Sequence, residues 1–208
     1  MSQNNQDGTD LRLPIGLAAA LLPVLIWSWI APHERLTWWM EALPVLIAVP
    51  LLALTIQRFP LTPLLYCLIW VHCVILLVGA HYTYALVPIG DWARDSLGLS
   101  RNPYDRLGHL VQGLVPALVA RELLIRLTPL RPGAWLFSIV TLSTLGISAG
   151  YELIEWLSVE ILDGDAESFL GQQGDVWDAQ KDMAIALIGA IIGQFMFAKH
   201  QDRAIKIL

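Results

Sequence analysis

Ionisable side chains interrupt three apolar segments of this 208-residue chain, and their types and spacing could do chemistry. His109 follows Asp105 by four residues, so both side chains share one face of a helix. Glu152 and Glu155 share a face in the next apolar segment, and Asp182 lies near the start of the last one. Charged groups are costly inside hydrocarbon, so each of these residues is a candidate functional residue.

One imidazole and several carboxylates form a ligand set for a hard or borderline divalent cation. The same groups could instead perform general acid and base catalysis without a cation. The candidate catalytic residues, which are also the candidate metal ligands, are His109, Glu152, Glu155 and Asp182. The sequence contains no HExxH motif, so the cofactor is unknown apart from a candidate divalent metal ion, and enzymatic activity stays open.

Other polar residues are expected at a similar depth, where they would support this site. These supporting positions are His81, Tyr84, Asp105, Gln112, Tyr151, Asp175 and Asp178. Structural alternatives exist for several of them. Asp105 and Asp178 suit solvated first turns of helices, and His109 could be a structural histidine bonded to Glu152 or Glu155.

The elements that must hold these residues are predicted to be transmembrane helices. Hydrophobic residues make up 56% of the chain and charged residues 15%, against roughly 25% charged residues in soluble domains. A helix needs about 20 mostly apolar residues to cross the bilayer. Six segments qualify, at about 13–31, 37–57, 62–83, 105–127, 133–157 and 179–198. We therefore predict an all-α, polytopic membrane helix bundle that forms a single domain over residues 1–208.

The distribution of charge predicts an orientation and excludes one class of partner. With the N-terminus in the cytoplasm, seven Lys and Arg residues lie inside and five outside, so we expect both termini to be cytoplasmic. The long connections 84–104 and 158–178 then face outward, and Asp163, Asp165 and Glu167 in the second are either solvated or hold a cation. A net charge of −5 argues against nucleic acid as a partner.

Four stretches carry a family resemblance: HYTYALVPIGDW, YDRLGHLVQG, SAGYELIEW and FLGQQGDVWDAQKDM. From about residue 60 to 198 the chain resembles the YjdF-like family of small bacterial inner-membrane proteins. More distantly, it is similar to VanZ-like proteins, which are associated with glycopeptide (teicoplanin) resistance. The positions of this chain that correspond to the VanZ-like pattern are, in order, Asp105 and His109, Glu152 or Glu155, Asp182, and Gly189 to Gly193. The resemblance implies a bacterial inner-membrane fold, and the second carboxylate and the long FLGQQGDVWDAQ connection depart from the VanZ-like pattern.

The sequence favours a multi-pass inner-membrane protein with an outward-facing acidic and histidine pocket. This pocket would bind or act on a polar envelope molecule, such as a lipid head group, with or without a divalent ion. A small proton-coupled transporter is the first alternative, although its polar residues would be expected nearer the midplane. The second is a structural membrane protein whose polar stripes only form interhelical hydrogen bonds. The lipid bilayer is the one expected partner in all three cases, and the oligomeric state is not encoded in any recognisable pattern.

Overall fold

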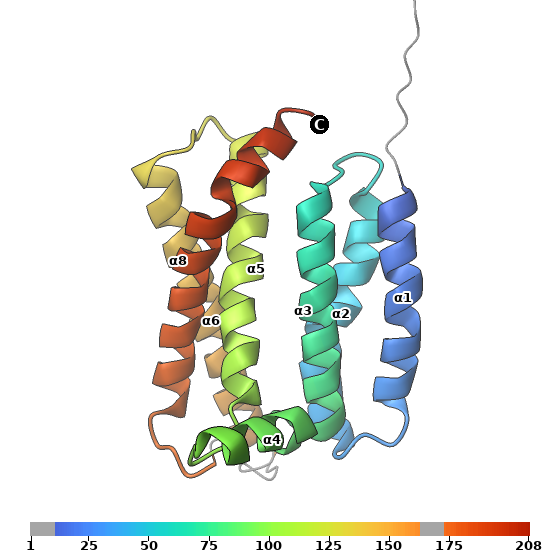
Figure 1. The fold of residues 1–208 in the computed structure, drawn as a ribbon, viewed down its shortest axis with the longest axis vertical. Coiled ribbons are helices and arrows are strands. Elements are labelled where there is room, and N and C mark those ends of the chain that lie inside the picture. The colour runs from blue at the N-terminus through green and yellow to red at the C-terminus, as the bar shows by residue number, and fades with distance from the viewer. Residues whose placement is uncertain (1–10, 163–172) are drawn as a thin grey trace, which may run out of the picture.

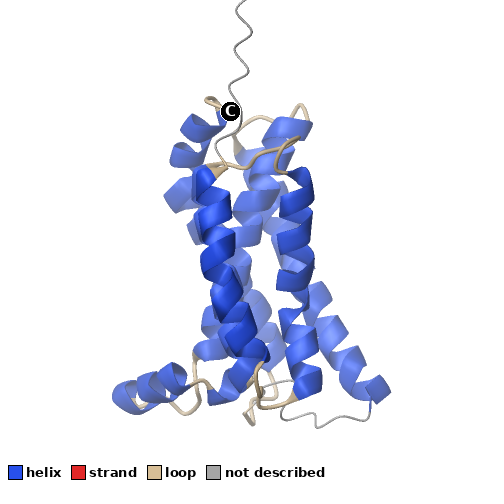
Figure 2. Cartoon of the chain, turned by 90° about the vertical axis from the view of Figure 1, so that its right-hand side faces the viewer, coloured by secondary structure: helices blue, strands red, loops and turns tan. Residues whose placement is uncertain are grey.

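A computed structural model describes residues 11–162 and 173–208, and within these ranges the chain is helical and has no strand (Figures 1 and 2). The elements are α1 (Arg12–Trp29), α2 (Arg35–Thr55), α3 (Pro63–Tyr82), η1 (Tyr84–Leu86), α4 (Pro88–Leu97), α5 (Tyr104–Leu127), α6 (Ala134–Leu162) and α8 (Asp178–Ile205). The prediction of an all-α membrane helix bundle is confirmed. The acidic residues Asp163, Asp165 and Glu167 lie outside the described residues.

The long helices form two groups that stand side by side (Figure 1). Helices α1, α2 and α3 make the N-terminal half, and α5, α6 and α8 make the C-terminal half. Contacts between α3 and α5 join the two halves. Helix α4 lies across one end of the bundle, and the C-terminus and the start of α1 lie at the opposite end. We call these the α4 end and the terminal end.

Five of the described helices are long and apolar enough to cross a membrane, namely α1, α2, α3, α6 and α8. Helix α5 has 24 residues but is more polar, because it carries Asp105, Arg106, Arg121, Glu122 and Arg126. It packs against α3 on one side and against α6 and α8 on the other, so neighbouring helices cover much of its polar surface. Helices α6 and α8 run to Leu162 and Ile205, beyond the expected ends of these spans.

Glycines allow α8 to lie directly against α5. A Cβ atom on Gly189 would lie 2.1 Å from the backbone oxygen of Leu110, and one on Gly113 would lie 1.9 Å from that of Ala186. Gly193 is similarly close to Leu114. Gly189 and Gly193 form a GxxxG sequence, which allows this close helix packing. Asp182 lies seven residues before Gly189, about two helical turns, so this contact also brings Asp182 toward α5.

Hydrogen bonds to a buried carboxylate on α5 join the two halves at the terminal end, and ion pairs of α5 lie beside them. Glu122 is fully buried on α5 and accepts hydrogen bonds from the backbone N–H of Thr62, at 3.0 Å, and from its hydroxyl, at 2.8 Å. Arg126 donates to the same carboxylate at 3.0 Å. On the other side of α5, Arg121 lies 2.7 Å from a carboxylate oxygen of Asp202 on α8. Polar groups of α5 are thus paired where they would otherwise face hydrocarbon.

Candidate functional site

Helices α5 and α8 bring three candidate ligands together near the α4 end. One side-chain ligand atom each from Asp105, His109 and Asp182 lies within 4.8 Å of the other two. The four-residue spacing on α5 places Nε2 of His109 3.5 Å from an oxygen of Asp105. The glycine contact between α5 and α8 supplies Asp182, whose exposed fraction is only 2%.

Helix α6 adds a further carboxylate to this cluster. An oxygen of Glu152 lies 3.6 Å from Nε2 of His109. The other ring nitrogen, Nδ1, lies 2.9 Å from the side-chain oxygen of Gln112. An amide oxygen only accepts, so Nδ1 carries the proton in this arrangement. Gln112 thus orients the imidazole so that Nε2 faces Asp105 and Glu152, as the outer hydrogen-bond partners of metal ligands do.

Two carboxylate oxygens of this cluster lack a hydrogen-bond partner. They are Oε1 of Glu152 and Oδ1 of Asp182, and both atoms are buried. A buried polar atom without a partner costs about 1–3 kcal/mol, and more when it is charged. Native proteins therefore rarely leave such atoms unsatisfied. A cation held by Asp105, His109 and Asp182 would satisfy the Asp182 oxygen, so these three residues fit a metal ion.

A cavity of about 150 Å³ adjoins the cluster at the junction of the two halves. We call it the head cavity. Its lining residues are Glu41, Pro44, His72, Leu76, Tyr84, Asp105, Gly108, His109, Gln112, Pro116, Ile147, Tyr151 and Glu155. The hydroxyl of Tyr151 donates to the backbone oxygen of Met40 at 3.2 Å, which ties α6 to α2 beside the cavity. Of the two glutamates on α6, Glu155 lines the head cavity, and Glu152 lies beside His109 in the cluster.

Glu41 on α2 belongs to this cavity and was missed by the sequence analysis. Its exposed fraction is 7%, and it is the acidic residue that α2 contributes to the lining. Its position inside the predicted span 37–57 could have identified it, because a carboxylate there is as costly to bury in hydrocarbon as Glu152 is. The cavity therefore draws acidic side chains from both halves of the bundle.

Tyr84 closes the head cavity from the turn after α3. Its ring lies against two glycines, and a Cβ atom would come within 2.5 Å of the ring at Gly79 and within 2.9 Å at Gly108. Burial, and then the neighbouring charge of Glu41, raise the pKa of the Tyr84 hydroxyl well above its ordinary value. Tyr84 therefore keeps its proton and presents a hydrogen-bond donor to the cavity.

His81 is not among the residues that line the head cavity. Its Nδ1 lies 3.2 Å from the backbone oxygen of Ser28, and its ring stacks on Trp27 with centroids 4.3 Å apart. Thr83 has a positive φ of 54°, which turns the chain sharply between His81 and Tyr84. As a result His81 packs against α1 while Tyr84 reaches the cavity.

Asp175 and Asp178 bind arginines beside the cluster instead of lining the cavity. Arg101 pairs with Asp178 and also lies 3.3 Å from Asp105. Arg106 lies 3.1 Å from Asp175. The pKa of Arg101 is raised, because the hydrogen bond and charge of Asp178 outweigh the opposing effect of burial. Asp175 and Asp178 are thus compensated by basic partners, whereas no Lys or Arg is among the residues that line the head cavity.

A family model described as "Predicted membrane protein (DUF2238)" matches residues 13–203. The chain belongs to this family. It is also 50% identical over 189 residues to the protein named "Inner membrane protein YjdF" from Escherichia coli (strain K12), an alignment that covers 91% of this chain and 90% of that protein. No solved structure gave a significant match.

Membership of the DUF2238 family confirms the YjdF-like resemblance and the assignment as a multi-pass membrane protein. The matched range includes every residue of the cluster and of the head cavity. The more distant likeness to VanZ-like proteins stays a prediction.

Proposed function

We propose that this DUF2238 protein is a bacterial inner-membrane protein that binds a polar envelope molecule through a divalent cation held by Asp105, His109 and Asp182. Glu152 is the fourth candidate ligand. The observation that carries the proposal is the meeting of three ligand groups, one of which, Asp182, has a buried carboxylate oxygen without a hydrogen-bond partner. A cation would leave open coordination positions facing the head cavity, where a polar group of the bound molecule could enter.

The spread of the ligand atoms is close to what a metal ion requires. Ligand oxygens and nitrogens lie about 2.0–2.2 Å from a transition-metal ion, so two ligands on opposite sides are separated by at most about 4.4 Å. The three atoms lie within 4.8 Å of one another, so side-chain adjustments of a few tenths of an ångström would complete the site. A mixed imidazole and carboxylate set suits zinc, manganese or iron better than calcium or magnesium.

The proposed orientation places the cluster and the head cavity at the outer face of the inner membrane. The C-terminus and the start of α1 lie at the terminal end, which the excess of Lys and Arg assigns to the cytoplasm. The cluster lies at the α4 end, near the N-terminal ends of α5 and α8. The location of the Escherichia coli relative in the inner membrane, as its name states, supports the same location here.

Metal analysis of the purified protein tests this proposal. We expect about one equivalent of a divalent transition metal in the wild type and its loss in Asp182→Asn and His109→Gln. Asp202→Asn is the matched control, because it makes the same change on the same helix at the terminal end, where Asp202 pairs with Arg121. Equal metal content in Asp182→Asn and Asp202→Asn, with both variants folded, would overturn the proposal.

A second candidate function is proton-coupled transport, which one observation favours. The head cavity extends from Asp105 to His72 in the middle of α3, so polar groups reach toward the midplane. Uptake into proteoliposomes that depends on a proton gradient, and that Glu155→Gln abolishes, would support this function. Absence of metal from the folded wild type would favour the purely structural alternative, in which polar side chains only join helices.

A further inference from the structure

An apolar cavity of about 380 Å³ continues from the head cavity along the junction of the two halves. We call it the tail cavity. The two cavities share five lining residues, which are Pro44, His72, Leu76, Pro116 and Ile147. Apart from His72, the tail cavity is lined by apolar side chains of α2, α3, α5 and α6 and by Leu61. A polar compartment and an apolar compartment thus share one boundary.

The dimensions and position of the tail cavity suit a hydrocarbon chain. An apolar cavity of about 150 Å³ can hold benzene, so this one has room for a longer apolar group. Two of its lining residues, Leu51 and Ile147, are 56% and 50% exposed on the outside of the bundle. In a bilayer that surface faces lipid, so a chain could enter sideways from the membrane.

The charges of the head cavity select the polar part of such a ligand. A cation at Asp105, His109 and Asp182 would attract a phosphate, which the acidic groups alone would repel. Glu41 and Glu155 also line the cavity, and its lining contains no Lys or Arg. A primary ammonium group would complement these two carboxylates. A phosphate and an ammonium group on one short head group would therefore meet both parts of the site.

His72 marks the boundary between the two compartments. Its Nε2 is buried and has no hydrogen-bond partner. A phospholipid carries ester groups between its phosphate and its chains, and an N–H at this position could donate to an ester carbonyl. The unsatisfied nitrogen therefore lies where the proposed ligand would present an acceptor.

We propose that the head and tail cavities together bind one amine-bearing phospholipid, of the phosphoethanolamine class. Its phosphate contacts the cation, its ammonium group contacts Glu41 and Glu155, and one chain occupies the tail cavity. The phosphate contact rests on the proposed function above. Because the cluster lies at the α4 end, the ligand would be drawn from the outer leaflet.

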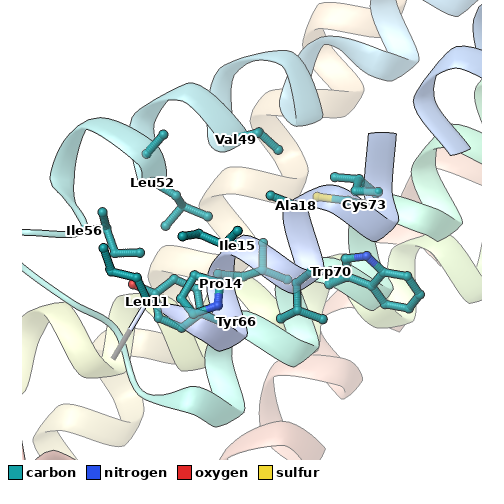
Figure 3. Close-up of a pocket in the computed structure, with 14 residues that line it drawn as sticks. Leu11, Pro14, Ile15, Ala18, Val49, Leu52, Ile56, Tyr66, Trp70 and Cys73 are labelled. Atoms are coloured by element: carbon teal, nitrogen blue, oxygen red, sulfur yellow. The ribbon is translucent and has the colours of Figure 1, made fainter. Parts of the chain in front are cut away.

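A neighbouring apolar groove provides an internal control. It has a volume of about 290 Å³ and lies among α1, α2 and α3, where residues such as Ala18, Leu52 and Trp70 line it (Figure 3). It shares Leu52, Ile69 and Cys73 with the tail cavity and no lining residue with the head cavity. A lipid chain held in this groove alone would leave its head group away from the cluster, so we expect the groove to contact lipid without head-group selectivity.

The test measures phospholipid retained by the full-length protein after purification in detergent, with metal content determined on the same samples. Ala48→Trp and Ala120→Trp fill the tail cavity from opposite walls, and Ala53→Trp fills the neighbouring groove. We expect about one phosphatidylethanolamine per wild-type and Ala53→Trp protein, and about a tenfold loss in the two tail-cavity variants, because the displaced chain loses buried methylene groups. Metal content should be unchanged in all three variants.

Two further measurements separate the parts of the proposal. Soluble phosphoethanolamine, which lacks chains, should bind more weakly than a short-chain phosphatidylethanolamine. Glu155→Gln should reduce the preference for phosphatidylethanolamine over phosphatidylglycerol while metal is retained. Equal lipid retention in the Ala48→Trp, Ala120→Trp and Ala53→Trp proteins, or equal binding of the two lipid classes by the wild type, would overturn the lipid proposal. Loss of metal in Asp182→Asn would still support the cation site in either case.

Discussion

Replacement of Gly189 by alanine tests whether the contact between α5 and α8 builds the cluster. The added Cβ would lie 2.1 Å from the backbone oxygen of Leu110, against at least 3.4 Å for an ordinary contact, so the helices must separate by about 1.3 Å (3.4 − 2.1). Backbone atoms cannot rotate away as a flexible side chain can. Overpacking of this kind costs about 1–3 kcal/mol of the free energy of unfolding.

The same shift should weaken the metal site. Asp182 lies on α8 about two turns from Gly189, and functional geometries are usually held to about 0.5 Å. We therefore expect Gly189→Ala to lower both the midpoint of thermal unfolding in detergent and the retained metal. Gly146→Ala on α6 is the control, since its Cβ would have no heavy atom within 4 Å. In a helix interior that change alone should stabilise the protein by about 0.5–1 kcal/mol.

Two results would refute this reasoning. If Gly189→Ala and Gly146→Ala shifted the unfolding midpoint equally, α8 would not lie against α5 as closely as the structure places it. If Gly189→Ala destabilised the protein but retained metal with unchanged affinity, the position of Asp182 would not depend on this contact, and the cluster would need another explanation.

Three further predictions concern regions outside the membrane-spanning helices. Hydrogen bonds from backbone N–H groups at the start of α2 lower the pKa of Glu34 and outweigh the opposing effect of burial, so Glu34→Gln should cost about 1 kcal/mol at neutral pH. Because the pKa of Glu34 is lower in the folded protein, its carboxylate stabilises the fold at pH values above the unfolded pKa of 4.5. The difference in thermal unfolding midpoint between wild type and Glu34→Gln should therefore vanish as the pH falls through the folded pKa. Tyr84→Phe should leave the ultraviolet titration of phenolate unchanged up to about pH 11, because the raised pKa keeps Tyr84 protonated in that range. A phenolate signal that is smaller in Tyr84→Phe than in the wild type below that pH would contradict this. Two cysteine variants on a Cys67→Ser background test the orientation. Ser96→Cys on α4 should react with a membrane-impermeant thiol reagent in intact cells, and Lys206→Cys should react only after lysis. The reverse pattern would invert the proposed orientation.

Local sequence patterns indicate two parts of the site, one within a helix and one at a contact between helices. The pairing of Asp105 with His109 follows from four-residue spacing, and the approach of Asp182 to α5 follows from Gly189 and Gly193. These features depend on helical periodicity and on small residues, both of which are visible in a sequence.

Contacts between distant segments could not be predicted in the same way. Asp178 pairs with Arg101 across 77 positions, and no periodic pattern links a helix start to a connection so far away. His81 and Tyr84 are three residues apart, yet the left-handed backbone at Thr83 sends only one of them to the cavity. Glu41 was detectable from its span alone, but its relation to Glu155 required the packing of the two halves.

The polarity of α5 has a consequence for how the protein enters the membrane. A charged residue adds about 2.5–3.5 kcal/mol to the cost of insertion by the translocon at the middle of a span and less toward its ends, so Arg121 and Glu122, near the terminal end of α5, weaken the insertion of this segment by itself. The Thr62 groups that satisfy Glu122 precede α5 in the chain and are already synthesised when α5 emerges, whereas the partner of Arg121, Asp202, is made last. We therefore expect α5 to leave the translocon against α3 and to reach its final depth only when α8 has been completed, which makes the last helix a requirement for biogenesis of the whole bundle.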